Sequence, residues 1–125
     1  MMSKENQEDQ ISVLRSDIVV NPSDTVVLRV ENADNELVVV LNDLLLYNRK
    51  TERDPSLRDE IELGEILKPG INFLNVLGID WGHVFHYKFS LDVNGNNVSS
   101  FSRDDSGPIS GFGLQRHYGL SIEVR

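Results

Sequence analysis

The side chains best suited to bind a ligand gather around the only tryptophan of the chain. Trp81 follows Asp80, and His83 stands two positions further on. Aromatic rings stack on the apolar faces of sugars, while carboxylates and imidazoles bond polar groups of a ligand. This stretch therefore predicts a loop that binds carbohydrate, aided by Arg103 and Asp105 from a later loop. The alternative is that Trp81 closes the open end of a hydrophobic core, since a large ring covers much apolar surface.

The three histidines could in principle hold a metal ion. His83 and His86 are three residues apart, and His117 could supply a third ligand. Residues three apart on a strand point to opposite faces, so the first two would converge only if His83 lies in a loop. We therefore interpret them as histidines at the end of a sheet and predict no metal site.

Acidic side chains offer oxygen ligands for calcium, but their spacing does not favour a site. Asp104 and Asp105 could be joined by Asp92 or Asp80, yet no EF-hand spacing is present. A solvated acidic loop is the interpretation we prefer. No arrangement of nucleophile and base stands out either, so we predict a protein that is not an enzyme and needs no cofactor.

The length, net charge and cysteine content of the chain exclude several classes of protein and of binding partner. The chain has 125 residues, a formal net charge of −8 and no cysteine. The absence of cysteine excludes a disulfide-stapled scaffold and a zinc ribbon. An acidic chain repels phosphate backbones, so we expect no nucleic-acid partner, and no apolar run suggests a membrane partner. Residues 1–10 are polar and lack the apolar region of a secretory signal, which predicts a flexible lead-in and a cytoplasmic location.

The kinds of apolar residue indicate the elements that must position the candidate site. The chain contains 14 Val, 8 Ile and 15 Leu but one Ala, whereas helical proteins are usually rich in Ala. With 11 Asn, 9 Gly and 4 Pro to supply turns, this composition predicts an all-β domain over residues 11–125.

Alternation of apolar and polar residues predicts about eight strands. It is strongest over 85–93, where the Asn94–Gly95 hairpin turn follows. We expect long loops over 48–59, which is rich in charge, and over 102–113, which is rich in Gly and Ser. The other apolar-rich segments expected to form these strands cover residues 17–20, 25–30, 36–41, 44–47, 60–63, 71–79, 98–101 and 117–124, and 11–14 could add a short edge strand.

Residues 37–93 resemble a known family. The run Val38–Asp43, followed by Lys68-Pro69-Gly70 and then Asn72, Leu74 and Val76, is similar to a pattern of galactose-binding-like jelly-roll domains, as in the sugar-binding-like domain of family 2 glycosidases. The resemblance implies an antiparallel jelly-roll sandwich in which the Pro-Gly turn reverses the chain and the Asn bonds the turn backbone. The chain departs from the pattern at Asn42-Asp43, where the family prefers Asn-Gly. The matching residues are structural, so no catalytic site is implied.

Two functions follow as hypotheses. The first is a non-catalytic, lectin-like module that binds carbohydrate around Trp81. The second is an assembly protein that forms homo-oligomers through sheet edges or faces. It is suggested by runs at Val38–Val40 and Leu44–Leu46 that are apolar on both strand faces.

Overall fold

Every regular element is a β-strand in the computed structural model, which describes residues 12–51, 57–81, 85–105 and 113–125. The all-β class predicted from the sequence is thus confirmed. No helix in this part of the chain is long and apolar enough to cross a membrane. The eight strands are β1 (Ser12–Val20), β2 (Val26–Leu41), β3 (Leu44–Thr51), β4 (Asp59–Glu62), β5 (Gly70–Asp80), β6 (Phe85–Val93), β7 (Asn96–Asp105) and β8 (Gly113–Val124).

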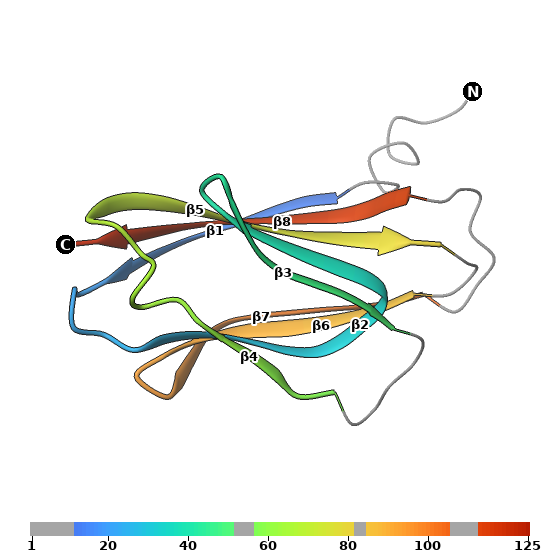
Figure 1. Ribbon diagram of the computed structural model, residues 1–125, viewed down its shortest axis with the longest axis horizontal. Helices are drawn as coiled ribbons and strands as arrows, with labels where there is room; N and C mark the ends of the chain where they lie inside the picture. The colour runs from blue at the N-terminus through green and yellow to red at the C-terminus, as the bar shows by residue number, and fades with distance from the viewer. Residues whose placement is uncertain (1–11, 52–56, 82–84, 106–112) are drawn as a thin grey trace.

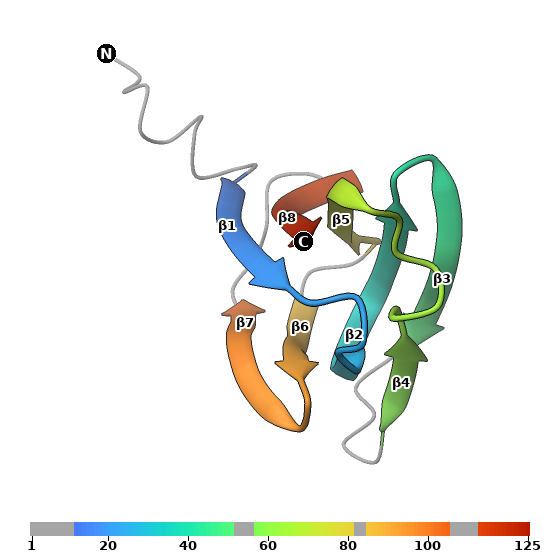
Figure 2. The same ribbon diagram turned by 90° about the vertical axis from the view of Figure 1, so that its left-hand side faces the viewer.

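A single long strand joins the two halves of the sheet. The strand order is β1-β8-β5-β2-β6-β7, and β3 and β4 also pair with β2. The first part of β2 pairs with β4 and β6, whereas its last residues pair with β3 and β5. Figure 1 shows β2 curving from one side of the molecule to the other, and Figure 2 shows the strands arranged around a central core. The sheet is consequently nearly barrel-shaped.

For clarity we name the two sides by their strands. The five-stranded half consists of β1, β8, β5, the end of β2, and β3, and the four-stranded half consists of β4, the start of β2, β6 and β7. All pairs are antiparallel except β1 and β8, which run parallel. The expectation of wholly antiparallel pairing is wrong for this pair. Strands at opposite ends of the chain need no hairpin between them, so turn geometry does not fix their relative direction.

The core is built from the inward positions of each strand, as the alternation predicted. Leu28 and Val30 of β2, Leu74 and Val76 of β5, and Leu91 of β6 are fully buried. Aromatic rings fill the centre, with centroids 4.9–5.1 Å apart, and they come from Phe89, Phe101 and Tyr118. Such contacts add to the stabilisation that burial of apolar area gives.

The predicted turns are confirmed by the backbone. Asn94 and Gly95 both have positive φ, 52° and 82°, as a type I′ hairpin requires. Gly70 has φ 88° after Pro69, a conformation that favours glycine. Asn72 is fully buried and bonds the backbone at Lys68 in both directions, through Oδ1 to the amide (2.9 Å) and through Nδ2 to the carbonyl (2.8 Å).

Several expected loops are instead strand. The expected break at 32–35 lies inside β2, where register shifts accommodate the turn-forming residues. The segments 11–14 and 17–20 belong, over the described residues, to the single strand β1. The two expected long loops are shorter, because β3 continues to Thr51 and β7 to Asp105. Residues 1–11, 52–56 and 106–112 lie outside the described residues.

Candidate functional site

Three of the predicted ligand-binding residues, Asp80, Arg103 and Asp105, belong to strands that end at the same end of the fold. Asp80 is the last residue of β5, and its backbone pairs with the first residue of β8. In the other half, Asp105 is the last residue of β7 and pairs with the first residue of β6, while Arg103 pairs with Tyr87. Figure 1 shows these strand ends on the right. The structure describes only the backbone of Arg103 and Asp105, and His83 lies outside the described residues.

Trp81 lies on the outer surface rather than over the core. The residue is 51% exposed, and this exposure does not favour the interpretation that Trp81 closes the open end of the core. The indole Nε1 donates to Glu36 Oε1 at 2.7 Å, and the Trp81 amide donates to Asn35 Oδ1 at 2.6 Å. One hydrogen bond to β2 holds the indole ring and the other holds the Trp81 backbone, while half of the residue stays accessible.

Polar groups surround this ring on β2 and β3. Asn48 Nδ2 donates to Glu36 Oε2 at 2.8 Å, and Lys50 Nζ lies 5.5 Å from the centroid of the Trp81 ring, within cation–π range. The hydrogen bond from Trp81 is the main reason that the pKa of Glu36 falls below its ordinary value of 4.5. Glu36 is therefore ionised at neutral pH and accepts hydrogen bonds. We call Trp81, Glu36, Asn48 and Lys50 the Trp81 shelf.

Asp80 does not belong to this surface, which corrects its predicted role. Its side chain is fully buried, so it does not reach a ligand on the outside. Asp34 and Arg116 are also buried, so both signs of charge are present inside the fold. The pKa of the Tyr87 phenol is raised, first by burial and then by the nearby Asp80 carboxylate. These groups form a polar part of the interior.

His86 and His117 lie on strands that are not neighbours, and His83 lies outside the described residues. His117 lies on the outer face of β8, where Nε2 is 2.7 Å from Asn75 Oδ1, and His86 pairs with Asp34 on β2. Within the described ranges no group of three His, Cys, Asp or Glu side chains could hold a metal ion. Asp92, named as a possible calcium ligand, accepts instead from Arg29 Nε at 2.6 Å.

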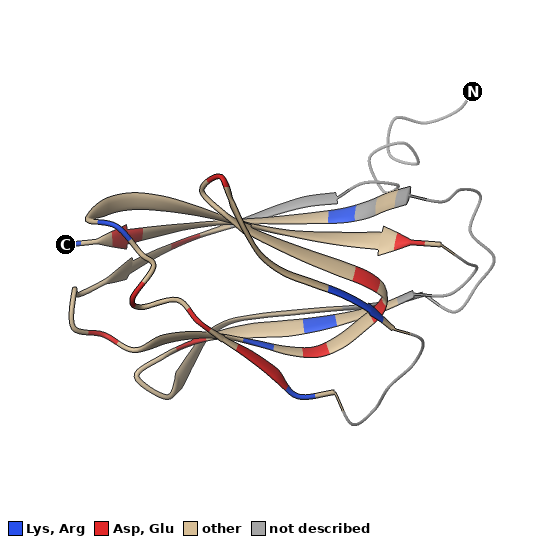
Figure 3. Ribbon diagram, viewed as in Figure 1, with Lys and Arg blue, Asp and Glu red and all other residues tan. Residues whose placement is uncertain are grey.

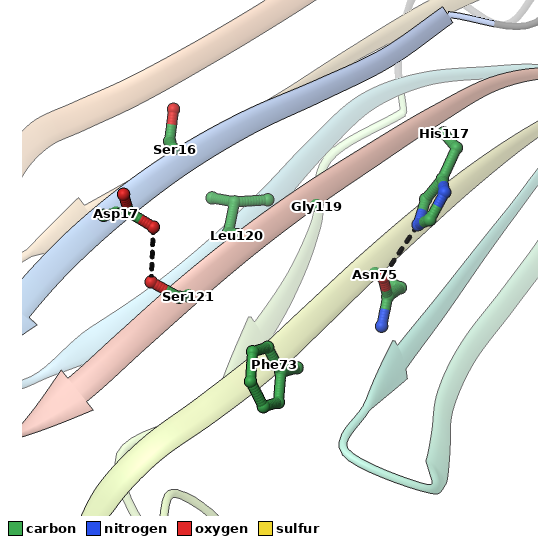
Figure 4. Close-up of a pocket in the computed structure, with 8 residues that line it drawn as sticks. All are labelled: Ser16, Asp17, Phe73, Asn75, His117, Gly119, Leu120 and Ser121. Atoms are coloured by element: carbon green, nitrogen blue, oxygen red, sulfur yellow. Dashed lines mark hydrogen bonds between the residues drawn. The ribbon is translucent and has the colours of Figure 1, made fainter.

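A hollow on the same outer face was not predicted from the sequence. It has a volume of about 240 Å³ and spans β1, β8 and β5 (Figure 4). Gly119 lies between the larger groups that line the hollow (Figure 4). The other residues that line the hollow are Ser16, Asp17, Phe73, Asn75, His117, Leu120 and Ser121.

Both surfaces depend on contacts between residues that are far apart in the chain. Glu36 and Trp81 are 45 positions apart, and the Ser121 hydroxyl donates at 2.7 Å to Asp17, 104 positions away. No local spacing could reveal such pairs. The one signal that marked either surface was the presence of Trp81 beside polar residues.

Comparisons with models of known protein families, with curated protein sequences and with solved structures found no match. The resemblance to galactose-binding-like jelly-roll domains therefore stays a prediction based on the residues that carry it.

Proposed function

We propose that this chain is a non-catalytic module that binds carbohydrate through the Trp81 shelf. The observation that carries the proposal is an indole ring that is half exposed, donates from Nε1 to Glu36, and belongs to a residue whose backbone amide is bonded to Asn35. A ring fixed before the ligand arrives loses little conformational entropy on binding. Its apolar face suits the C–H face of a sugar ring, and the ring edge is lined by groups that bond hydroxyls.

The polar groups of the shelf supply both kinds of hydrogen-bond partner. Ionised Glu36 accepts, Lys50 donates, and the amide of Asn48 does both. The family resemblance supports the same class of ligand, since the domains it points to include sugar-binding folds, although their matching residues are structural.

A glycan array tests the proposal, with purified wild type and a Trp81→Ala variant. We expect wild type to bind one class of glycan and the variant to bind it at least about thirtyfold more weakly, since a central aromatic contributes about 2 kcal/mol or more. Because Trp81 is the only tryptophan, its fluorescence should also change on titration with the bound glycan.

The matched control is Leu45→Ala. Leu45 is 60% exposed and lies on β3 opposite Val40, away from the indole, so this change should leave binding intact. If wild type binds no glycan, or Trp81→Ala binds as wild type does, the proposal is wrong.

Self-association through the sheet face is the second candidate function. It is favoured by exposed apolar side chains near the β2–β3 hairpin, where Leu44, Leu45, Ile71 and Phe73 are 51–61% exposed. Apolar patches of this kind often mark interfaces. Sedimentation velocity at micromolar concentrations checks it: a dimer that Leu45→Asp converts to a monomer supports this function, and a monomer throughout refutes it.

A further inference from the structure

Two exposed aromatic rings lie on one side of one strand. Along β5 the even positions from Asn72 to Asp80 are buried, so the odd positions face outward. Phe73, 54% exposed, and Trp81 both occupy this outward register. They are eight residues apart, which corresponds to about 26 Å along an extended strand. This span is much longer than one sugar ring.

The hollow beside Phe73 carries the chemistry of a sugar subsite. The Phe73 ring offers an apolar surface, and Figure 4 shows Asn75 and His117 on one side of Gly119 and Asp17 with Ser121 on the other. Hydroxyl, amide, imidazole and carboxylate groups together provide donors and acceptors. A volume of about 240 Å³ is below the roughly 300–1,000 Å³ typical of pockets for drug-sized ligands, which suits a single ring.

The surface of β5 between the two aromatics is uncharged. The polar Asn75 and the apolar Leu77 and Ile79 face outward there, and Val38 and Val40 lie opposite Leu77 and Asn75 on β2. All five side chains are only partly buried. Figure 3 shows that β5 carries no charge before its last residue, Asp80. A continuous uncharged strip therefore joins the Trp81 shelf to the hollow.

The negative charge of the protein limits which class of polymer can bind along the strip. The protein has a net charge of −8, and the hollow itself contributes the carboxylate of Asp17. An acidic polysaccharide or a nucleic acid would be repelled at both. A neutral glycan meets no such repulsion, and it presents alternating apolar and hydroxyl surfaces to the strip.

We propose that the ligand is an extended neutral glycan that lies along the outer side of β5, with one ring on the Trp81 shelf and another in the hollow beside Phe73. This inference rests on the proposed carbohydrate-binding function. Two subsites on one chain bind more tightly than either does separately, because the second contact is made at high effective concentration.

Isothermal titration calorimetry with matched disaccharides and hexasaccharides tests this inference. The probes are oligomers of β-1,4-linked glucose, xylose and galactose and of α-1,4-linked glucose. For the wild type we expect one hexasaccharide to bind at least about tenfold more tightly than its disaccharide. Phe73→Ala should remove this advantage of length. In NMR spectra, the amide resonances of His117 and Gly119 should shift when the hexasaccharide binds.

Ile71→Ala is the matched control. Ile71 is 61% exposed on the same side of β5 but does not line the hollow, so the control should keep the advantage of length. A Phe73→Ala variant that keeps the wild-type advantage, while Trp81→Ala loses binding, overturns this inference and leaves the proposed function standing. If no oligosaccharide binds the wild type, the proposed function fails as well. If the wild type is instead a dimer that Phe73→Ala dissociates, the strip is a contact between two copies, and this inference is also overturned.

Discussion

Replacing Gly78 with alanine should destabilise the fold, because no space exists for the added methyl group. Gly78 lies on the inward side of β5, where a Cβ atom would sit 2.7 Å from Cε2 of Tyr87 and 2.9 Å from its Cδ2 and Cζ. Carbon atoms normally pack about 3.5–4.0 Å apart, so the shortfall is roughly 1 Å. The Tyr87 ring is fully buried and cannot swing into solvent, so β5 and β6 would have to move.

The magnitude follows from two opposing effects. Overpacking a dense core by one methyl group costs about 1–3 kcal/mol. Replacing glycine also stabilises the folded state relative to the unfolded chain by about 0.4–1 kcal/mol, because alanine has less freedom when unfolded. We therefore expect a net loss of about 1–2 kcal/mol in the free energy of unfolding. For a domain of this size that loss corresponds to a fall in Tm of about 4–8 °C.

Urea denaturation followed by far-UV circular dichroism measures this loss, and a double-mutant cycle assigns it. Tyr87→Leu removes the ring atoms that the new methyl group would meet. In that background Gly78→Ala should cost at least about 1 kcal/mol less than in the wild type. If Gly78→Ala leaves the denaturation midpoint unchanged, or if the effects of Gly78→Ala and Tyr87→Leu are additive, the close approach of the Tyr87 ring to β5 is not the reason that position 78 requires glycine.

Three further predictions concern hydrogen bonds. Because the pKa of Glu36 is lowered in the folded state, its ionised form stabilises the fold above pH 4.5, and this stabilisation is lost as the pH falls through the lowered pKa. Trp81 fluorescence should therefore change only below pH 4.5, since the indole donates to Glu36. Glu36→Gln should abolish that transition. Asn72→Asp keeps the shape of the side chain but removes its N–H donors to backbone carbonyls, and urea denaturation should show a loss of about 2–4 kcal/mol; an unchanged midpoint would mean that these bonds contribute little. Tyr47→Phe removes the bond to Asp59 and should cost about 1 kcal/mol in the same assay, whereas a larger loss would point to a packing role for the hydroxyl.

Local patterns were enough to predict the parts of the fold that depend on neighbouring residues. The alternation over 85–93 identified β6, and Asn94–Gly95 identified its turn, because both features are set by residues next to one another in the chain. That Asn72 bonds the turn backbone was predicted through the family resemblance, and these bonds to Lys68 are likewise local, whereas its bond to the Ile122 carbonyl is not.

Features set by distant pairing were not predictable in this way. The residues 32–35 are typical of a turn, yet pairing keeps them in β2: Asn32 to Asp34 pair with β6 after a register shift, and Asn35 pairs with β3. Gly78 was treated as an ordinary strand position, although an isolated glycine in a strand often marks a close approach. The sequence does not say which side chain approaches, since Tyr87 comes from another strand.

In the candidate site, too, residue types could be recognised from the local sequence, whereas the placement of the side chains depends on distant contacts. Trp81 could be singled out by its type, but whether it covered the core or faced solvent depended on hydrogen bonds to Glu36 and Asn35 across the sheet. Asp80 was grouped with it by adjacency, and the alternation of β5 turns these two neighbours to opposite sides. Adjacent residues in a strand thus point to opposite faces of the sheet, whereas adjacent residues in a loop can point to the same side.

The outer faces of the two halves differ in a way that the fold itself does not require. On the four-stranded half the outward positions carry charge, with Arg29 bonded to Glu60 at 2.5 Å and to Asp92 at 2.6 Å, and Lys88 3.3 Å from Glu31. On the five-stranded half the corresponding strip along β5 and β2 is mostly apolar, carries no charge on β5, and ends in exposed aromatic rings. Both halves bury their inward residues in one core, so core packing explains neither outer face. Exposed apolar area gives no stability to the folded monomer, whereas a charged outer face keeps it dispersed in water. This contrast supports our proposal that a neutral glycan binds along the strip, and self-association through the same strip is the alternative that the dimer measurement tests.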